Sequence, residues 1–176
     1  MYYLAGDIGG TKALLQLMKV EPSTSISTPS NQTHSSLILG EKRYLCHEFD
    51  SLESIITSFL QSFHLSNKYS PAIDSACFGL PGLVDGRVVK LTNLPWVVNA
   101  DLIEQVCGIQ TVRFVNDFYA AALGVDALMP ADKITLYSPK ETPPNEGNRL
   151  VIGAGTGLGV APVFYDGQNY LPQASE

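Results

Sequence analysis

The stretch DIGGTK, residues 7–12, decides how the N-terminal part of this chain folds. It joins two apolar runs of strand length, residues 2–7 and 13–20, and a glycine turn between two such runs predicts a β-hairpin. Glycines at the tip let backbone N–H groups approach an anion, which forms a concave nest for phosphate oxygens. An ordinary tight turn is the simpler interpretation of this segment taken alone. It is not a P-loop, because the chain contains no Gly-Lys pair.

The polar side chains of this turn fit phosphate chemistry. Thr11 can donate to a phosphate oxygen, and Lys12 places a positive charge nearby. Asp7, at the end of the first strand, can hold Mg²⁺ through coordinated water, since this ion keeps several waters and takes few carboxylates. We therefore expect a phosphate and magnesium site at this hairpin.

A second glycine-rich segment, GAGTGLG at residues 153–159, lies between the strand-like runs 149–152 and 160–165. Because its flanks are strongly apolar, the glycines are expected to sit in a fixed turn rather than in a flexible loop. The segment does not match the G-x-G-x-x-G pattern of dinucleotide-binding folds. Two glycine-threonine hairpins facing each other across a cleft would suit the two ends of a polyphosphate.

Between the two hairpins, strand and helix patterns alternate. Apolar residues from Leu52 to Phe63 recur at helical spacing behind a cap at Asp50 or Ser51. Residues 21–36 are rich in Ser, Thr and Pro and predict a surface excursion. Alternating strands and helices indicate an α/β fold with parallel strands beside the first hairpin. We expect further strands at 37–47, 73–79, 87–91 and 111–115, and helices from Asn99 to Gly108 and over 117–128.

The same order of elements begins twice, which bears on domain organisation. A first α/β domain is predicted over residues 1–137, and a second begins at 149–176 with the second hairpin. If both parts share one plan, we expect the second copy to be incomplete, with two or three strands and without the helices that would cover them. The alternative is one self-contained α/β domain with a C-terminal hairpin.

Composition excludes several classes of protein. With 45% hydrophobic and 16% charged residues the chain can form a core, and its net charge of −6 disfavours nucleic acid as a partner. Three dispersed cysteines support neither a disulfide framework nor a zinc knuckle. The N-terminus lacks the pattern of a signal peptide, and no apolar run is long enough to span a membrane. A cytoplasmic location without membrane contact is expected.

Two further segments carry candidate functional side chains. Asn116 and Asp117 stand where a predicted strand ends and a helix begins, the place where open α/β sheets bind ligands. Asp117 can take the proton of an attacking hydroxyl, or it can serve only as the helix N-cap. Asn93 lies in LTNLPW, residues 91–96, and either contacts a sugar hydroxyl or sits in a turn while Trp96 packs in the core. Taken alone, the second interpretation of this loop is favoured.

These four segments occur in an order that resembles the bacterial glucokinase family. DIGGTK resembles its first phosphate motif, GAGTGLG its second, FVND at 114–117 its catalytic segment and LTNLPW its glucose loop. The resemblance covers the whole chain and implies an actin-like ATPase (ribonuclease H-like) fold, of which this sequence resembles the N-terminal half. It also implies ATP-dependent phosphorylation of glucose at O6, with ATP and Mg²⁺ as cofactors.

The resemblance assigns roles residue by residue. Asp117 would be the general base, and Asp7 would hold Mg²⁺ through water. Ser175-Glu176 matches the start of the family's Ser-Glu-Gly-Gly-His segment, whose Glu and His bind glucose. The expected glucose contacts are Asn93, Asn116, Asp117 and Glu176. The expected ATP contacts are Gly6, Asp7, Ile8, Gly9, Gly10, Thr11, Lys12, Gly153, Gly155, Thr156 and Gly157.

Two other classes of function are weighed beside the kinase. A non-catalytic sugar-sensing regulator on the same fold would bind sugar without turnover, although the intact Asp117 argues against it. An interaction module whose glycine loops are only turns would bind neither nucleotide nor sugar. Glucose and ATP are the expected partners. A homodimer is left open, because the sequence does not show the oligomeric state.

Overall fold

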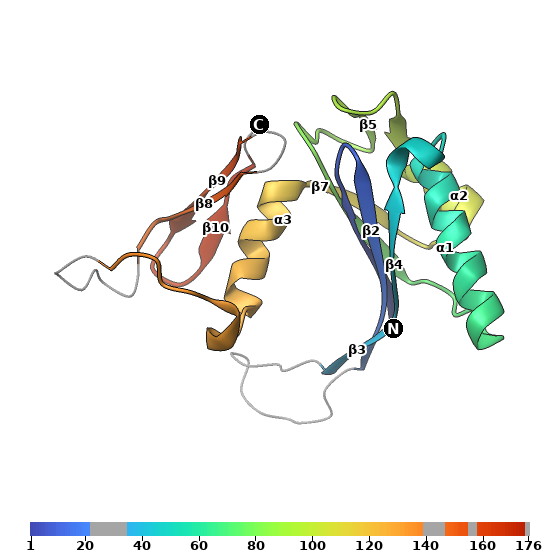
Figure 1. The fold of residues 1–176 in the computed structure, drawn as a ribbon, viewed down its shortest axis with the longest axis horizontal. Coiled ribbons are helices and arrows are strands. Elements are labelled where there is room, and N and C mark those ends of the chain that lie inside the picture. Colours follow the sequence, from blue (N-terminus) through green and yellow to red (C-terminus); the bar gives the residue numbers. More distant parts are fainter. Residues whose placement is uncertain (22–34, 139–146, 155–157, 175–176) are drawn as a thin grey trace.

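A computed structural model describes residues 1–21, 35–138, 147–154 and 158–174. Its largest element is a mixed five-stranded sheet in the order β3-β2-β1-β4-β7 (Figure 1). The predicted hairpin supplies the antiparallel pair β1–β2, and β1, β4 and β7 pair in parallel. The α/β class and the mixed sheet are confirmed. The strands are β1 (Tyr2–Ile8), β2 (Lys12–Glu21), β3 (Ser35–Leu45), β4 (Ser75–Leu80) and β7 (Val112–Asn116).

Two helices, α1 (Leu52–Asn67) and α2 (Ala100–Cys107), lie on one side of this sheet (Figure 1). Ser51 caps α1, because its side chain accepts from the Ser54 N–H while the Ser54 hydroxyl accepts from the Ser51 N–H. Asn99 caps α2 as expected. The apolar face predicted for α1 is buried against the sheet, with Leu52, Ile55 and Ile56 fully inaccessible to solvent.

The other side of the sheet is occupied by α3 (Asp117–Gly124), which lies between the five-stranded sheet and a second, antiparallel sheet (Figure 1). The helix is shorter than predicted, because residues Val125–Ala127 continue as a 3₁₀ turn. The second sheet has the order β10-β9-β8, so the expected second hairpin is present. Its strands are β8 (Arg149–Ala154), β9 (Leu158–Tyr165) and β10 (Tyr170–Pro172).

The apolar interior divides into two clusters. The larger one fills the space between the five-stranded sheet and α1 and α2. The smaller one joins Ala122 of α3 to Ala161 and Val163 of β9, with Phe118 packed against it. On its opposite face the second sheet exposes large apolar side chains, among them Ile152 and Phe164. The helix α3 thus has contacts with both sheets, and the predicted division of the chain between 137 and 149 stays a prediction.

A small hairpin of β5 (Val88–Lys90) and β6 (Val97–Asn99) carries the loop with Asn93. Trp96 is 4% exposed and belongs to the larger cluster, so its predicted packing role is confirmed. The strands β6 and β10 were not predicted, because a strand of three residues is too short to show an alternating pattern. Among the described helices none has both the length and the apolar character needed to cross a bilayer.

Candidate active site

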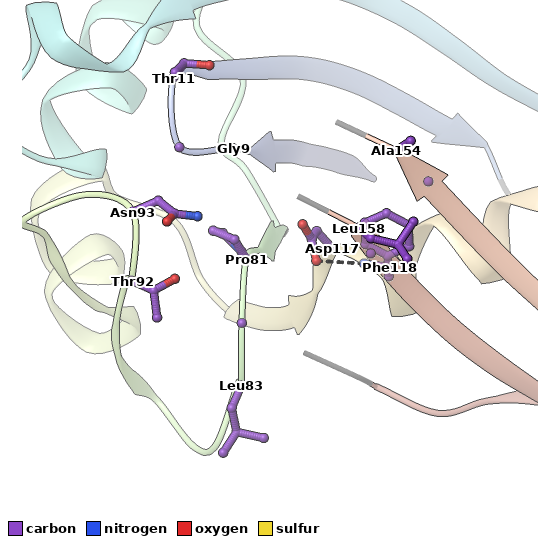
Figure 2. A pocket seen from close by; sticks show the side chains of 14 residues that line it. Gly9, Thr11, Pro81, Leu83, Thr92, Asn93, Asp117, Phe118, Ala154 and Leu158 are labelled. Atoms are coloured by element: carbon purple, nitrogen blue, oxygen red, sulfur yellow. Dashed lines mark hydrogen bonds between the residues drawn. The ribbon is translucent and has the colours of Figure 1, made fainter. Parts of the chain in front are cut away.

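A cavity of about 910 Å³ lies where the two sheets meet the start of α3. Both glycine hairpins contribute to its wall, together with the loop after β4 and the loop between β5 and β6. Figure 2 shows Thr92 and Asn93 across the cavity from Phe118 and Leu158. The lining residues are Gly9, Gly10, Thr11, Pro81, Gly82, Leu83, Thr92, Asn93, Asp117, Phe118, Gly153, Ala154, Leu158 and Gly159.

The first hairpin turn is held from two sides. The Gly9 N–H donates to the Lys12 carbonyl at 2.8 Å and closes the turn, while the Cys46 N–H donates to the Thr11 carbonyl at 2.9 Å. A Cβ added to Gly10 would lie 2.9 Å from the Cβ of Asn93. The predicted phosphate turn therefore touches the predicted sugar loop. Any larger side chain at position 10 would displace Asn93 from its place in the cavity wall.

Not every residue expected to contact ATP faces this cavity. Ile8 is completely buried in the larger cluster. A Cβ on Gly6 would meet the Phe78 ring at 2.4 Å and the Leu15 side chain at 2.9 Å, so this glycine faces the core. Asp7 is exposed at the end of β1, and Lys12 is exposed at the start of β2. Among the ATP contacts expected from the first hairpin, Gly9, Gly10 and Thr11 line the cavity. Among those expected from the second hairpin, Gly153 lines it.

Some predicted site residues lie outside the described part of the chain. These are Gly155, Thr156 and Gly157 of the second hairpin tip and Glu176, the expected glucose ligand. Their roles stay predictions.

The carboxylate of Asp117 is fixed through one of its two oxygens. Oδ1 accepts from the Phe118 N–H at 2.9 Å and from the Asn116 side-chain amide at 3.2 Å. Both of these hydrogen bonds use Oδ1, and Asp117 lines the cavity. Oδ2 is therefore the oxygen with which Asp117 can meet a ligand placed there.

Asn116 holds the start of α3, and its expected contact with glucose stays a prediction. It is 3% exposed and is not among the described residues that line the cavity. Its side-chain oxygen accepts from the Tyr119 N–H at 2.9 Å, which makes Asn116 the N-cap of α3. The alternative interpretation of Asp117 as the helix cap is therefore wrong. The Asn116 amide also donates to the Gly82 carbonyl at 3.0 Å, so Asn116 ties the loop after β4 to Asp117.

The surroundings of Asp117 change its acidity. Burial raises the pKa of this carboxyl above its usual value, and the negative charge of Asp7 raises it further. The hydrogen bond from the Phe118 N–H has the opposite effect and lowers the pKa. Burial has the largest effect, so the pKa of Asp117 is raised on balance. A carboxylate with a raised pKa is a stronger base, which suits the removal of a proton from a hydroxyl group.

The residues around Asp7 fit a magnesium ion of the kind expected. No three His, Cys, Asp or Glu side chains among the described residues gather into a metal site, so a cage built only of protein ligands is absent there. Mg²⁺ does not need one, because one or two carboxylates with waters and phosphate oxygens satisfy it. The exposed carboxylate of Asp7, close enough to Asp117 to raise the pKa of Asp117, has the chemistry of such a ligand, and its role stays a prediction.

Several lining residues were not predicted as site residues. Pro81, Gly82 and Leu83 form the loop after β4, and their position after a buried strand was the available signal. Phe118 directly follows Asp117, yet its sequence position on a helix indicated only a core residue. Leu158 lies in the second glycine segment, but only the folded sheet shows that it reaches the cavity.

Comparison with known proteins gives one consistent result. The family model for Glucokinase matches residues 4–176. The chain is 34% identical to a glucokinase of Nostoc punctiforme over 173 residues, which are 98% of this chain and 46% of that protein. The chain thus spans about half the length of the curated relatives it matches.

Solved structures show the same fold. The crystal structure of a glucokinase from an Antarctic psychrotroph matches with a TM-score of 0.71 at 24% identity, over 99% of this chain and 50% of that one. A glucokinase from Balamuthia mandrillaris in complex with glucose matches with a TM-score of 0.65 at 19% identity, over 99% and 47%. These likenesses confirm the predicted actin-like ATPase fold. On the match of the family model to nearly all of its residues, the chain belongs to the glucokinase family.

Proposed function

We propose that the complete protein transfers the γ-phosphoryl group of ATP to O6 of glucose. The observation that carries the proposal is that Asp117, Asn93 and both glycine hairpins line one cavity. The proposed reaction needs a base, a sugar-binding group and phosphate-binding turns around one space, and these residues would supply them. Membership of the glucokinase family supports the choice of sugar and donor.

The proposed reaction uses Asp117 as the base. The O6 hydroxyl of glucose attacks the γ-phosphorus, and its proton passes to Oδ2 of Asp117. The bond between the γ-phosphorus and the β–γ bridging oxygen breaks, and ADP leaves. Oδ1 stays hydrogen-bonded to the Phe118 N–H and the Asn116 amide, so the carboxylate keeps its orientation during the transfer. Phosphoryl transfer depends mainly on such positioning and on charge stabilisation.

Each wall of the cavity has a role in this proposal. Asn93 would bind a sugar hydroxyl, and the backbone N–H groups at Gly9 and Gly10, with the Thr11 hydroxyl, would bind phosphate oxygens. The second hairpin, through Gly153, would hold the other end of the phosphate chain. When bound beside Asp7, Mg²⁺ would neutralise charge on the phosphate oxygens. Closure of the cavity would exclude water, which competes with glucose as a nucleophile.

The direct test is formation of glucose 6-phosphate from glucose and MgATP by the full-length gene product, with this 176-residue chain assayed beside it. We expect turnover by the full-length protein. ADP and polyphosphate are assayed as alternative donors, because the hairpins would contact phosphates rather than the base. If the full-length protein is inert with every hexose but still binds glucose, the sensor interpretation replaces the kinase.

The pH dependence of the reaction gives a further test. Only ionised Asp117 can accept the proton, so kcat/KM should fall as the pH drops through the pKa of this group. Because burial and Asp7 raise that pKa, the acid limb should lie at a higher pH than the usual Asp value of 3.8. The measurement is a pH profile of kcat/KM for glucose at saturating MgATP. An acid limb at or below the usual value would contradict the raised pKa.

A further inference from the structure

The ring of Phe118 occupies the space that side chains at two glycines of the second hairpin would need. A Cβ added to Gly159 would lie 1.8 Å from Cε2 of the ring, and one added to Gly153 would lie 2.7 Å from Cζ. Real Cβ atoms do not approach other atoms this closely, so neither position accepts a side chain while the ring stays in place. Neither glycine has a positive φ, so its backbone conformation does not require glycine.

We propose that Phe118 is a positioning residue for phosphoryl transfer: its ring seats the second glycine hairpin at a fixed place relative to the carboxylate of Asp117. On this view Gly153 and Gly159 are glycines because they receive the ring. The inference rests on the proposed kinase function. It gives a reason for two glycines that differs from contact with phosphate, the role that the family resemblance assigns to Gly153.

Phe118 contacts both Asp117 and the second glycine hairpin. The backbone N–H of Phe118 donates to Oδ1 of Asp117 at 2.9 Å, and its ring contacts both strands of the hairpin. A movement of Phe118 therefore changes the orientation of the base and the place of the hairpin together. Figure 2 shows Phe118 beside Asp117 at the cavity, which Leu158 of β9 also lines.

A second contact joins the second sheet to the chain beyond the end of α3. In the 3₁₀ turn that follows α3, Asp126 forms an ion pair with Arg149 at the start of β8. The guanidinium of Arg149 lies over the ring of Tyr170 in β10, 3.4 Å from its centroid. The second sheet is thus attached near both ends of α3, and its glycine hairpin is attached at the end that carries Asp117.

This placement matters because phosphoryl transfer needs the attacking oxygen and the leaving oxygen in line. A misplacement of about 1 Å can cost about 100-fold in rate. The clash at Gly159 is larger than this, since an ordinary carbon contact is 3.4–4 Å and the added Cβ would start at 1.8 Å from the ring. A methyl group at position 159 should therefore push the hairpin away from Asp117.

The test is a set of variants in the full-length gene product: Gly159→Ala, Phe118→Ala and the double variant. We expect Gly159→Ala to lower kcat about 100-fold and to raise the KM for ATP. Phe118→Ala should lower kcat by no more than about tenfold and raise the KM for ATP, while the dissociation constant of glucose stays within about threefold. In the double variant the methyl group occupies space left by the ring, so kcat should recover at least about tenfold over Gly159→Ala.

Matched controls separate this role from general packing. Gly124→Ala, at a glycine with no atom within 4 Å of an added Cβ, should leave kcat within twofold. Gly10→Ala displaces Asn93 instead of Phe118, so Phe118→Ala should not rescue it. All rates are measured well below the Tm of each variant, so that a smaller folded fraction does not imitate a lower kcat.

Three outcomes would overturn the proposal. The first is that wild type is active but the double variant is no more active than Gly159→Ala. Gly159 would then contact a ligand directly. The second is a Phe118→Ala variant that loses Tm but keeps kcat and the KM for ATP, which would make Phe118 a packing residue only. The third is an inert wild-type protein, which refutes the proposed kinase function and with it the role of Phe118.

Discussion

Asp117→Asn should lower kcat by about 10²- to 10⁴-fold, the usual contribution of a general base. The amide cannot accept the O6 proton, whereas its shape and its place at the start of α3 stay the same. The measurement is a steady-state assay of glucose 6-phosphate formation by the full-length protein. Asp85→Asn is the matched control, because Asp85 is exposed and does not line the cavity. Its kcat should stay within twofold of wild type.

The same substitution should leave the Tm at neutral pH equal to or above that of wild type. Burial and the charge of Asp7 disfavour the ionised form of Asp117 in the folded state, which is why its pKa is raised. A carboxyl whose pKa rises on folding stabilises the fold most at low pH, and this stability is lost as the pH rises through the folded-state pKa. If wild type is more stable than Asp117→Asn at any pH, the difference in stability should therefore be largest below the usual Asp pKa of 3.8.

Thermal unfolding followed by circular dichroism at several pH values checks this expectation. The Tm of the Asp117→Asn variant should rise relative to that of wild type as the pH rises through the pKa of Asp117. A variant that keeps kcat within tenfold of wild type would show that Asp117 is not the base. A variant with a clearly lower Tm at neutral pH would show that the folded state does not disfavour the ionised carboxylate.

Gly6→Ala should destabilise the protein by about 1–3 kcal/mol, the usual cost of overpacking a core. The added Cβ would lie 2.4 Å from Cδ1 of Phe78, a side chain with no exposed surface. β1 pairs with β2 on one side and with β4 on the other, so the backbone at Gly6 cannot easily move away. For a chain of this size the loss corresponds to a Tm lower by about 2–12 °C.

The control for this prediction is Gly124→Ala, which meets no atom within 4 Å and replaces glycine in a helix. Its Tm should equal or exceed that of wild type, because alanine favours the helix by up to about 1 kcal/mol. Urea unfolding gives the free energies for both variants. A KM for ATP that rises in Gly6→Ala without any loss of Tm would mean that Gly6 contacts the nucleotide, as the family resemblance implies.

Much of the fold was predictable because its signals are local. The N-cap at Ser51, the cap at Asn99 and the end of α2 at Gly108 depend on hydrogen bonds within a few residues. The helical spacing of apolar residues in α1 is a property of one segment. The hairpin of β1 and β2 needs only a turn between two apolar runs. Each of these elements was expected from the sequence and is present.

The candidate site was predictable only in part. Asn93 and Asp117 were expected in the site, and both line the cavity. The sequence did not show that Asn116 rather than Asp117 caps α3, because either side chain is a good N-cap and the choice depends on the loop after β4. The Gly82 carbonyl accepts from the Asn116 amide, and this contact joins residues 34 positions apart. Such a contact leaves no periodic pattern in the sequence.

The glycines separate what the sequence by itself determined from what the tertiary structure decided. The sequence determined that two glycine hairpins exist and that no side chain stands at their glycines. The sequence did not determine why each position requires glycine. An anion-binding turn, a left-handed backbone conformation and a closely packed neighbour can each require one. At Gly6 the neighbour is Phe78 and at Gly159 it is Phe118. These neighbours come from distant segments, and only the packing of the whole chain brings them to the space that a Cβ would fill.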